Sequence, residues 1–280
     1  MTLNSRHKKF FTVKSIKYTV KSLYKKVVTK TSIIAPVKIN GLDQADTYFF
    51  LLQHKIFRGA RRYHWGDNGG LRRPYGDSKL KYAAYDRNGN NQGVNHLGFA
   101  PWAEIAIWRY NSAGVQWDSD EIFSTTVHET AHSSQVYIMG NIKMWIDLDK
   151  RLLESWAVAV EWMMTQREYR ERGIAEYSSP TYDEIGDISY PISRAYQFWN
   201  FSHTNLRYTP LYIDLIDDHN QATTNNRFIR DNVRGYTLPQ IEGFLKNIYG
   251  FTSLGTQLKA HKPLGVTDGQ IDELLSQYQE

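Results

Sequence analysis

Cysteine is absent from this chain of 280 residues. Its absence excludes disulfides, zinc sites built from thiolates and cysteine nucleophiles. A metal site in this chain must therefore use histidine and carboxylate side chains. The compartment is left open, because cysteine-free chains occur both inside and outside bacterial cells.

Acidic residues are absent from residues 1–42, which hold ten of the 34 Lys and Arg. The rest of the chain carries 24 Lys and Arg against all 29 Asp and Glu. The formal net charge of +5 thus hides a mildly acidic body with a basic arm, residues 1–42. Binding to nucleic acid calls for basic residues on the folded body. We therefore expect no nucleic-acid partner.

Long apolar runs are also missing. No stretch approaches the roughly 18 apolar residues of a membrane span, so we expect no transmembrane segment. The first 20 residues lack the apolar core of a signal peptide. Taken literally, this predicts a soluble cytoplasmic protein. A fragment that begins after an export signal or an earlier domain fits the sequence equally well.

The basic arm is rich in Val, Ile, Thr, Tyr and Phe over residues 10–39, which favours strands. The spacing of Ile16, Val20, Leu23 and Val27 also fits a helical stripe. We interpret the lysines as a solvated sheet face or edge, where Lys discourages aggregation. A docking surface for an acidic partner is the alternative.

The body of the chain predicts an α+β fold. A helix is expected over residues 44–62, after an Asp-rich cap region. A turn-rich region follows, in which Asn88-Gly89 is a hairpin signal. Residues 102–110 alternate well enough for a strand. We divide this body, residues 43–280, into an N-terminal lobe (43–140) with a sheet and a mostly helical C-terminal lobe (141–280).

Two long helices are predicted next. One begins at Asp118 or Ser119 and stops at Gly140, and the other runs from an Asp cap in "DLDK" to Gly173. Further on, Thr and Pro begin a helix in "TPLYIDLIDD". The segments "TLPQIEGFL" and "TDGQIDELL" each place Gln three residues after a capping Thr.

The segment "TTVHETAHSSQ" lies on the first of these long helices. His128 and His132 are four residues apart, so both imidazoles project from one helix face and can share a metal ion. Glu129 flanks them and could act as a base on a metal-bound water. A pair of core or surface histidines with no metal is the plain alternative.

A third ligand is expected from another element, because catalytic zinc sites use three protein ligands and one open position. Glu154 and Glu161 lie with Ala157 and Val158 on one face of a strongly apolar helix. Carboxylates on such a face are costly to bury without a cation or hydrogen-bond partners. A glutamate pair that faces solvent explains this pattern less well.

The pattern "HETAH" followed by "ESWAVAVE" resembles the H-E-x-x-H and E-x-x-A-x-x-x-E motifs of gluzincin zinc peptidases. The segments "GLRRPYGDSKLKYAAYDR" and "YTPLYIDLIDD" also look like those of poorly characterised bacterial secreted or surface-associated members. Ser155 and Val158 depart from the family, which has Gly at the first position and, in thermolysin-type members, Asp at the second. No aminopeptidase-type G-x-M-E-N segment precedes the helix, so aminopeptidase specificity is not implied.

The resemblance implies a zincin-like fold with a cleft between the two lobes, and a secreted or cell-surface peptidase. One Zn²⁺ would be held by His128, His132 and Glu154, with Glu129 as general base and Glu161 supporting a ligand histidine. In gluzincins an edge strand before the metal helix holds the substrate backbone, and the strand at 102–110 would hold a peptide or protein substrate in this way, by strand addition. The donor to the oxyanion is expected in the C-terminal lobe, among Tyr190, Tyr196, His203, Tyr208 and Tyr212.

Two other functions stay open. A binding protein on a peptidase scaffold could grip glycan or peptide through its 19 Tyr and 8 Trp. The Glu129 base argues against it, since a scaffold without turnover has no need of that group. A zinc hydrolase specialised for glycoproteins or cell-wall peptides is the other, and nothing in the sequence separates it from a general endopeptidase.

Overall fold

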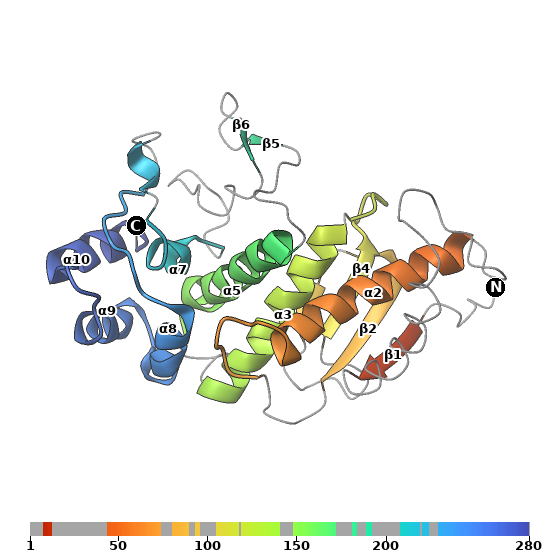
Figure 1. Ribbon diagram of the computed structural model, residues 1–280, viewed down its shortest axis with the longest axis horizontal. Helices are drawn as coiled ribbons and strands as arrows, with labels where there is room; N and C mark the ends of the chain where they lie inside the picture. Colours follow the sequence, from red (N-terminus) through yellow and green to blue (C-terminus); the bar gives the residue numbers. More distant parts are fainter. Residues whose placement is uncertain are drawn as a thin grey trace. The chain divides into compact units, whose positions relative to one another are not determined.

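The computed structural model describes residues 8–12, 44–73, 80–89, 93–95, 105–117, 119–140, 148–171, 181–183, 189–191, 208–218, 220–223 and 229–279. It combines long helices with a small mixed sheet, which confirms the α+β class (Figure 1). The chain divides within one helix into two compact units. The first comprises Met1–Asp67 and Arg73–Ser133, and the second Asn68–Arg72 and Ser134–Glu280.

The first unit is built on a four-stranded sheet of order β1-β2-β4-β3. Its strands are β1 (Lys8–Thr12), β2 (Lys81–Asn88), β3 (Gly93–Asn95) and β4 (Ile105–Tyr110). The central pair, β2 and β4, is parallel, and each outer strand pairs with its neighbour in the antiparallel direction. Among the described residues, β1 and β3 therefore form the two edges of this sheet.

One face of the sheet carries the core of this unit. Alternate residues Tyr82 and Ala84 of β2, and Ile105 and Ile107 of β4, belong to one buried cluster, as the two-residue period of a strand requires. The same cluster includes Leu52, Ile56 and Ala60 of helix α2 (Gln44–Trp65) and Ile122 of helix α3 (Ser119–Met139). Helices α2 and α3 thus cover this face (Figure 1).

Helix α3 is fixed closely within the first unit. A Cβ on Gly59 of α2 would lie 2.9 Å from the Phe123 carbonyl oxygen and 2.9 Å from Thr126 Cβ, so only glycine permits this approach. From the sheet, the Tyr82 hydroxyl makes a buried hydrogen bond of 3.0 Å with Thr130 Oγ1. Thr130 stands inside the HETAH motif, so this bond sets the motif's position relative to the sheet.

The second unit is mostly helical. It contains the C-terminal end of α3 and the helices α5 (Lys150–Glu171), α7 (Leu211–Asp214), α8 (Leu238–Phe244), α9 (Phe251–Ala260) and α10 (Asp268–Gln277). Single 3₁₀ turns lie at Gln221–Thr223 and Leu245–Asn247, and a two-stranded antiparallel ribbon pairs β5 (Thr181–Asp183) with β6 (Ser189–Pro191).

The predicted helix signals are confirmed for α3, α5, α8 and α10. In "TPLYIDLIDD" the prediction of Thr as cap and Pro as first helical residue is wrong, because Pro210 is the N-cap of α7 and the helix begins at Leu211. Gly140 ends α3 with a φ of 86°, in the left-handed region that favours glycine. Asp149 caps α5, because its Oδ1 accepts a 2.8 Å bond from the Arg151 N–H. Thr237 and Thr267 cap α8 and α10, each accepting from the N–H of the Gln three residues on.

Two strand predictions are wrong. Asn88-Gly89 is not a hairpin turn, because β2 pairs in parallel with β4 and the Gly89 N–H donates to the Tyr110 carbonyl of that strand. The strand predicted at 102–110 exists as β4, but it is not an edge, since β2 and β3 pair with its two sides. Of the strand-rich arm, only β1 lies within the described residues.

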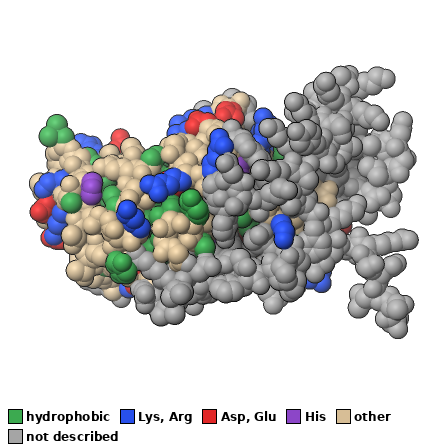
Figure 2. Space-filling model, turned by 90° about the horizontal axis from the view of Figure 1, so that it is seen from below, with side chains coloured by type: hydrophobic (Ala, Val, Ile, Leu, Met, Phe, Trp, Pro, Cys, Tyr) green, Lys and Arg blue, Asp and Glu red, His purple; other side chains and the backbone are tan. Residues whose placement is uncertain are grey.

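None of the described helices combines the length and the apolar character needed to cross a bilayer. On the described part of the face in Figure 2, Lys and Arg side chains are scattered among hydrophobic and other atoms. The expected absence of a nucleic-acid partner stays a prediction.

Candidate metal centre

The two histidines of the motif project from one side of α3. His128 and His132 are both buried, and their ring centroids lie 4.9 Å apart with the ring planes at 83°. This arrangement follows from their spacing of four residues, which stacks side chains one turn apart on a helix. Two imidazoles therefore meet in one place, as the sequence predicted.

The start of α5 is held by hydrogen bonds on both sides of Glu154, all within the second unit. The buried Gln135 amide, on the last part of α3, donates a 3.0 Å bond to the Leu153 carbonyl. The Ser155 hydroxyl makes a 2.7 Å hydrogen bond with Thr209 Oγ1 and accepts from the Thr209 N–H. The Gln135 bond thus fixes the start of α5 on the C-terminal part of α3, within the second unit.

These hydrogen bonds explain why serine stands at position 155. Its side chain is fully buried, and its hydrogen bond connects α5 to Thr209, two residues before the start of α7. Glycine, which the resemblance led us to expect at this position, could not make this bond. The departure from the family motif thus changes how the helix is anchored and leaves Glu154 itself in place.

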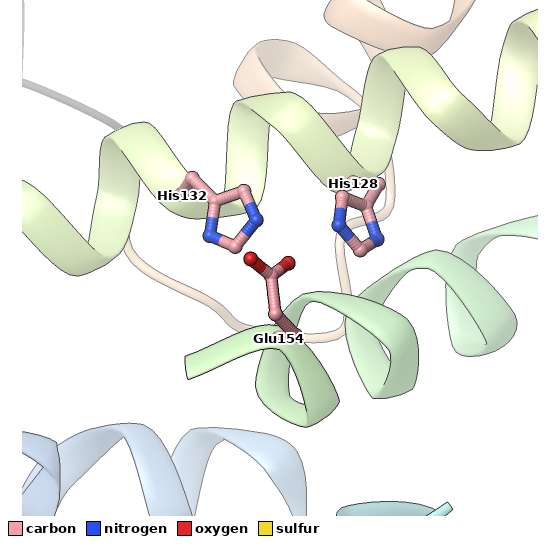
Figure 3. Close-up of side chains that lie close together, drawn as sticks. All are labelled: His128, His132 and Glu154. Atoms are coloured by element: carbon pink, nitrogen blue, oxygen red, sulfur yellow. The ribbon is translucent and has the colours of Figure 1, made fainter. Parts of the chain in front are cut away.

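His128, His132 and Glu154 form one group (Figure 3). One ligand atom from each side chain lies within 4.8 Å of the other two. Ligand atoms around a tetrahedral zinc ion are about 3.3 Å apart, given bonds of about 2.0–2.1 Å, so small side-chain rotations would close the set around an ion. Two imidazoles and a carboxylate, without thiolates, are donors that zinc accepts. The group therefore fits a zinc ion.

Glu129 occupies a different position from the three grouped residues. It is buried, and its Cγ and Oε1 are among the atoms closest to the place that a Cβ on Gly93 would occupy, at 2.9 Å each. Strand β3 thus passes directly against the side chain predicted to be the base. No sequence signal marks this approach, because Gly93 stands in a turn-rich stretch among many other polar and glycine residues.

Glu161 is buried on α5 but does not belong to the group. Seven residues separate it from Glu154, which places the two carboxylates two turns, or about 10 Å, apart along the helix axis. The geometry thus favours Glu154 as the third ligand. The role of Glu161 in support of a histidine stays a prediction.

The candidate oxyanion donors are only partly described. Tyr212 belongs to the core, with its ring packed edge-on against Trp156 at 5.7 Å between centroids. Burial, together with the charge of Asp149, raises the pKa of the Tyr212 hydroxyl. Tyr208 is exposed. The side chains of Tyr190, Tyr196 and His203 lie outside the described residues.

Comparison of the chain with protein-family models, with curated proteins and with solved structures finds no match. The interpretation of the site therefore depends on its own residues and their geometry. The chemistry of the donor set and the position of Glu129 beside a sheet edge are the two observations available for that purpose.

Proposed function

We propose that this protein is a zinc-dependent metallopeptidase with a zincin-like arrangement of sheet and metal helix. The observation that carries the proposal is the grouping of His128, His132 and Glu154, from two helices, within 4.8 Å. The motif alone accounts for the two histidines, but not for a buried face of α5 that presents a carboxylate to them. A neighbouring acidic residue, Glu129, supplies the base that hydrolysis requires.

In this proposal, metal binding and proton transfer are carried out by different residues. A zinc ion, when bound, lowers the pKa of its water ligand to about 7 and polarises a carbonyl oxygen. His128, His132 and Glu154 would hold the ion. Glu129 would accept a proton from the attacking water as its oxygen bonds to the carbonyl carbon, and would return that proton to the amide nitrogen as the C–N bond breaks.

The substrate is proposed to be an extended peptide bound along β3. The described edge of the sheet nearest Glu129 is this strand and not β4, because β4 is paired on both sides. An edge strand presents backbone N–H and C=O groups that an extended peptide can pair with. Such pairing would bring an amide bond of the substrate close to Glu129, whose side chain lies against Gly93.

Two measurements test the proposal together. Metal analysis of the purified protein should give about one zinc per chain, and digestion of a diverse peptide mixture, followed by mass spectrometry, should show new termini. A zinc-replete preparation that binds no transition metal would overturn the proposal. Zinc without any cleavage would favour a binding protein, and cleavage of glycopeptides or cell-wall peptides alone would favour a specialised hydrolase.

His128→Ala and His132→Ala are each expected to lose stable zinc binding, because either change leaves two protein ligands. Zinc content after dialysis against a weak chelator measures this. His261→Ala is the matched control, since His261 is an exposed histidine outside the group, next to the C-terminal end of α9. Zinc retained at the parent level in the His128 and His132 variants would show that the ion is bound elsewhere.

Deletion of residues 1–42 is expected to leave zinc content and hydrolysis unchanged while it lowers the thermal unfolding temperature. The deletion removes β1, which pairs with β2 over five residues. In the sheet order, β1 lies at the opposite edge from β3, which adjoins Glu129. A deleted form that is folded and zinc-loaded yet inactive would contradict the expectation.

A further inference from the structure

Gly93 faces helix α3 from the edge of the sheet. It pairs with Ile107 of β4, and directly opposed residues of antiparallel strands share a sheet face. Ile107 lies on the face that α2 and α3 cover, so position 93 is directed toward the same helices. The residues it meets there, Thr125 and Glu129, are four apart and thus adjacent on α3.

The space beside Gly93 is too small for any side chain. A Cβ at this position would lie 2.5 Å from Thr125 Cγ2 and 2.9 Å from both Cγ and Oε1 of Glu129. These are its three nearest atoms, and all are closer than ordinary van der Waals contact allows. The backbone φ of Gly93 is not positive, so conformation does not demand glycine here. Steric room is therefore the reason for this residue.

We propose that Gly93 is a positioning residue for Glu129. Because it lacks a Cβ, the backbone of β3 approaches the Glu129 side chain directly and limits the rotamers that its carboxylate can adopt. Thr125, one helical turn before Glu129, fills the rest of the space beside Gly93, with its Cγ2 the atom nearest to a Cβ at that position. The inference rests on the proposed function, in which Glu129 is the base.

A methyl group at position 93 would act mainly on Glu129. Thr125 has a single side-chain torsion angle with two rotamers in a helix, whereas the longer Glu129 side chain rotates about three bonds, so the Glu129 carboxylate is the group displaced furthest. Misplacement of a catalytic group by about 1 Å can cost about 100-fold in rate. His128 and His132 are not among the three nearest neighbours of this position, so zinc binding should persist.

Acetohydroxamate gives a test that does not depend on turnover, because it chelates zinc and donates a hydrogen bond to a neighbouring carboxylate. Its affinity for the zinc-loaded protein is measured by calorimetry in the parent, Gly93→Ala, Glu129→Gln and the double variant. Gly93→Ala should weaken binding about 10-fold in the parent, and by less than about 2-fold in the Glu129→Gln background, where there is no carboxylate left to misplace.

Gly59→Ala is the matched control. Its Cβ would also press on α3, at Phe123 and Thr126, but not on Glu129. It should lower the unfolding temperature and show the same acetohydroxamate affinity change in both backgrounds, to within about 2-fold. If Gly93→Ala behaves in this way too, or leaves the affinity unaltered, Gly93 has only a packing role and the inference is overturned.

If Gly93→Ala does not fold, the same cycle is run in the Thr125→Ser background, which removes the Cγ2 atom at 2.5 Å and leaves contact with Glu129 alone. Where the parent cleaves peptides, Gly93→Ala should also lower kcat with little change in KM. A parent that binds no zinc refutes the proposed function itself, whereas a zinc-loaded parent without coupling between positions 93 and 129 refutes only this inference.

Discussion

Glu129→Gln is expected to keep zinc and the fold but to lose peptide hydrolysis by about 10²–10⁴-fold, the usual contribution of one acid–base group. Glutamine has nearly the same shape as glutamate, so the close contact with Gly93 is preserved. It cannot accept a proton from water at neutral pH. The three grouped side chains remain, and zinc content should match that of the parent.

The measurement is the rate of appearance of new peptide termini at equal zinc occupancy. Glu121→Gln is the control, because it changes a glutamate on the same helix, two turns before Glu129, that is not part of the group. It should retain the parent rate. If Glu129→Gln also turned over peptides at that rate, Glu129 would have no role in the chemistry.

The helices could be predicted because their signals are local. A capping residue lies within three or four positions of the groups it satisfies, as Thr267 does with Gln270. The cap and its partner can therefore be recognised together in one short segment of sequence. Strand pairing depends on residues far apart. β2 pairs directly with β4, although β3 lies between them in the sequence, and no hydrophobic period marks the three residues of β3. For this reason the prediction that residues 102–110 form the substrate-binding edge strand is wrong.

In the candidate site too, the features set by local spacing could be predicted, whereas those set by tertiary contacts could not. The histidines follow from a spacing of four on one helix, and Glu154 from the polar residues on an apolar face of another. The start of α5, which carries Glu154, is held by tertiary bonds at the neighbouring Leu153 and Ser155, which the sequence does not display. The approach of Gly93 to Glu129 could not be predicted, because it requires the strand order as well as the register.

Glu154→Ala is expected to abolish stable zinc binding, whereas Glu161→Ala should weaken affinity or activity by about 10–100-fold. Both glutamates lie on one face of α5, so both would be plausible ligands from the sequence alone. Only Glu154 reaches within 4.8 Å of the histidine nitrogens. Two helical turns separate the carboxylates, so one ion cannot be bound by both.

Zinc titration against a chromophoric chelator measures the affinity of each variant, and Glu154→Gln adds a sharper comparison. Glutamine keeps the length of the side chain and the helix propensity, but it removes the charge that a carboxylate brings to a zinc ion. It should therefore bind zinc more weakly than the parent while it unfolds at a similar temperature. Tight zinc binding in Glu154→Ala, with loss of the ion in Glu161→Ala, would reverse the assignment and make the second glutamate the ligand. Ala157 is fully buried about one turn after Glu154. Its small side chain lets another segment pack closely on this part of the helix, so Glu154, and not Glu161, is the glutamate placed to reach a metal.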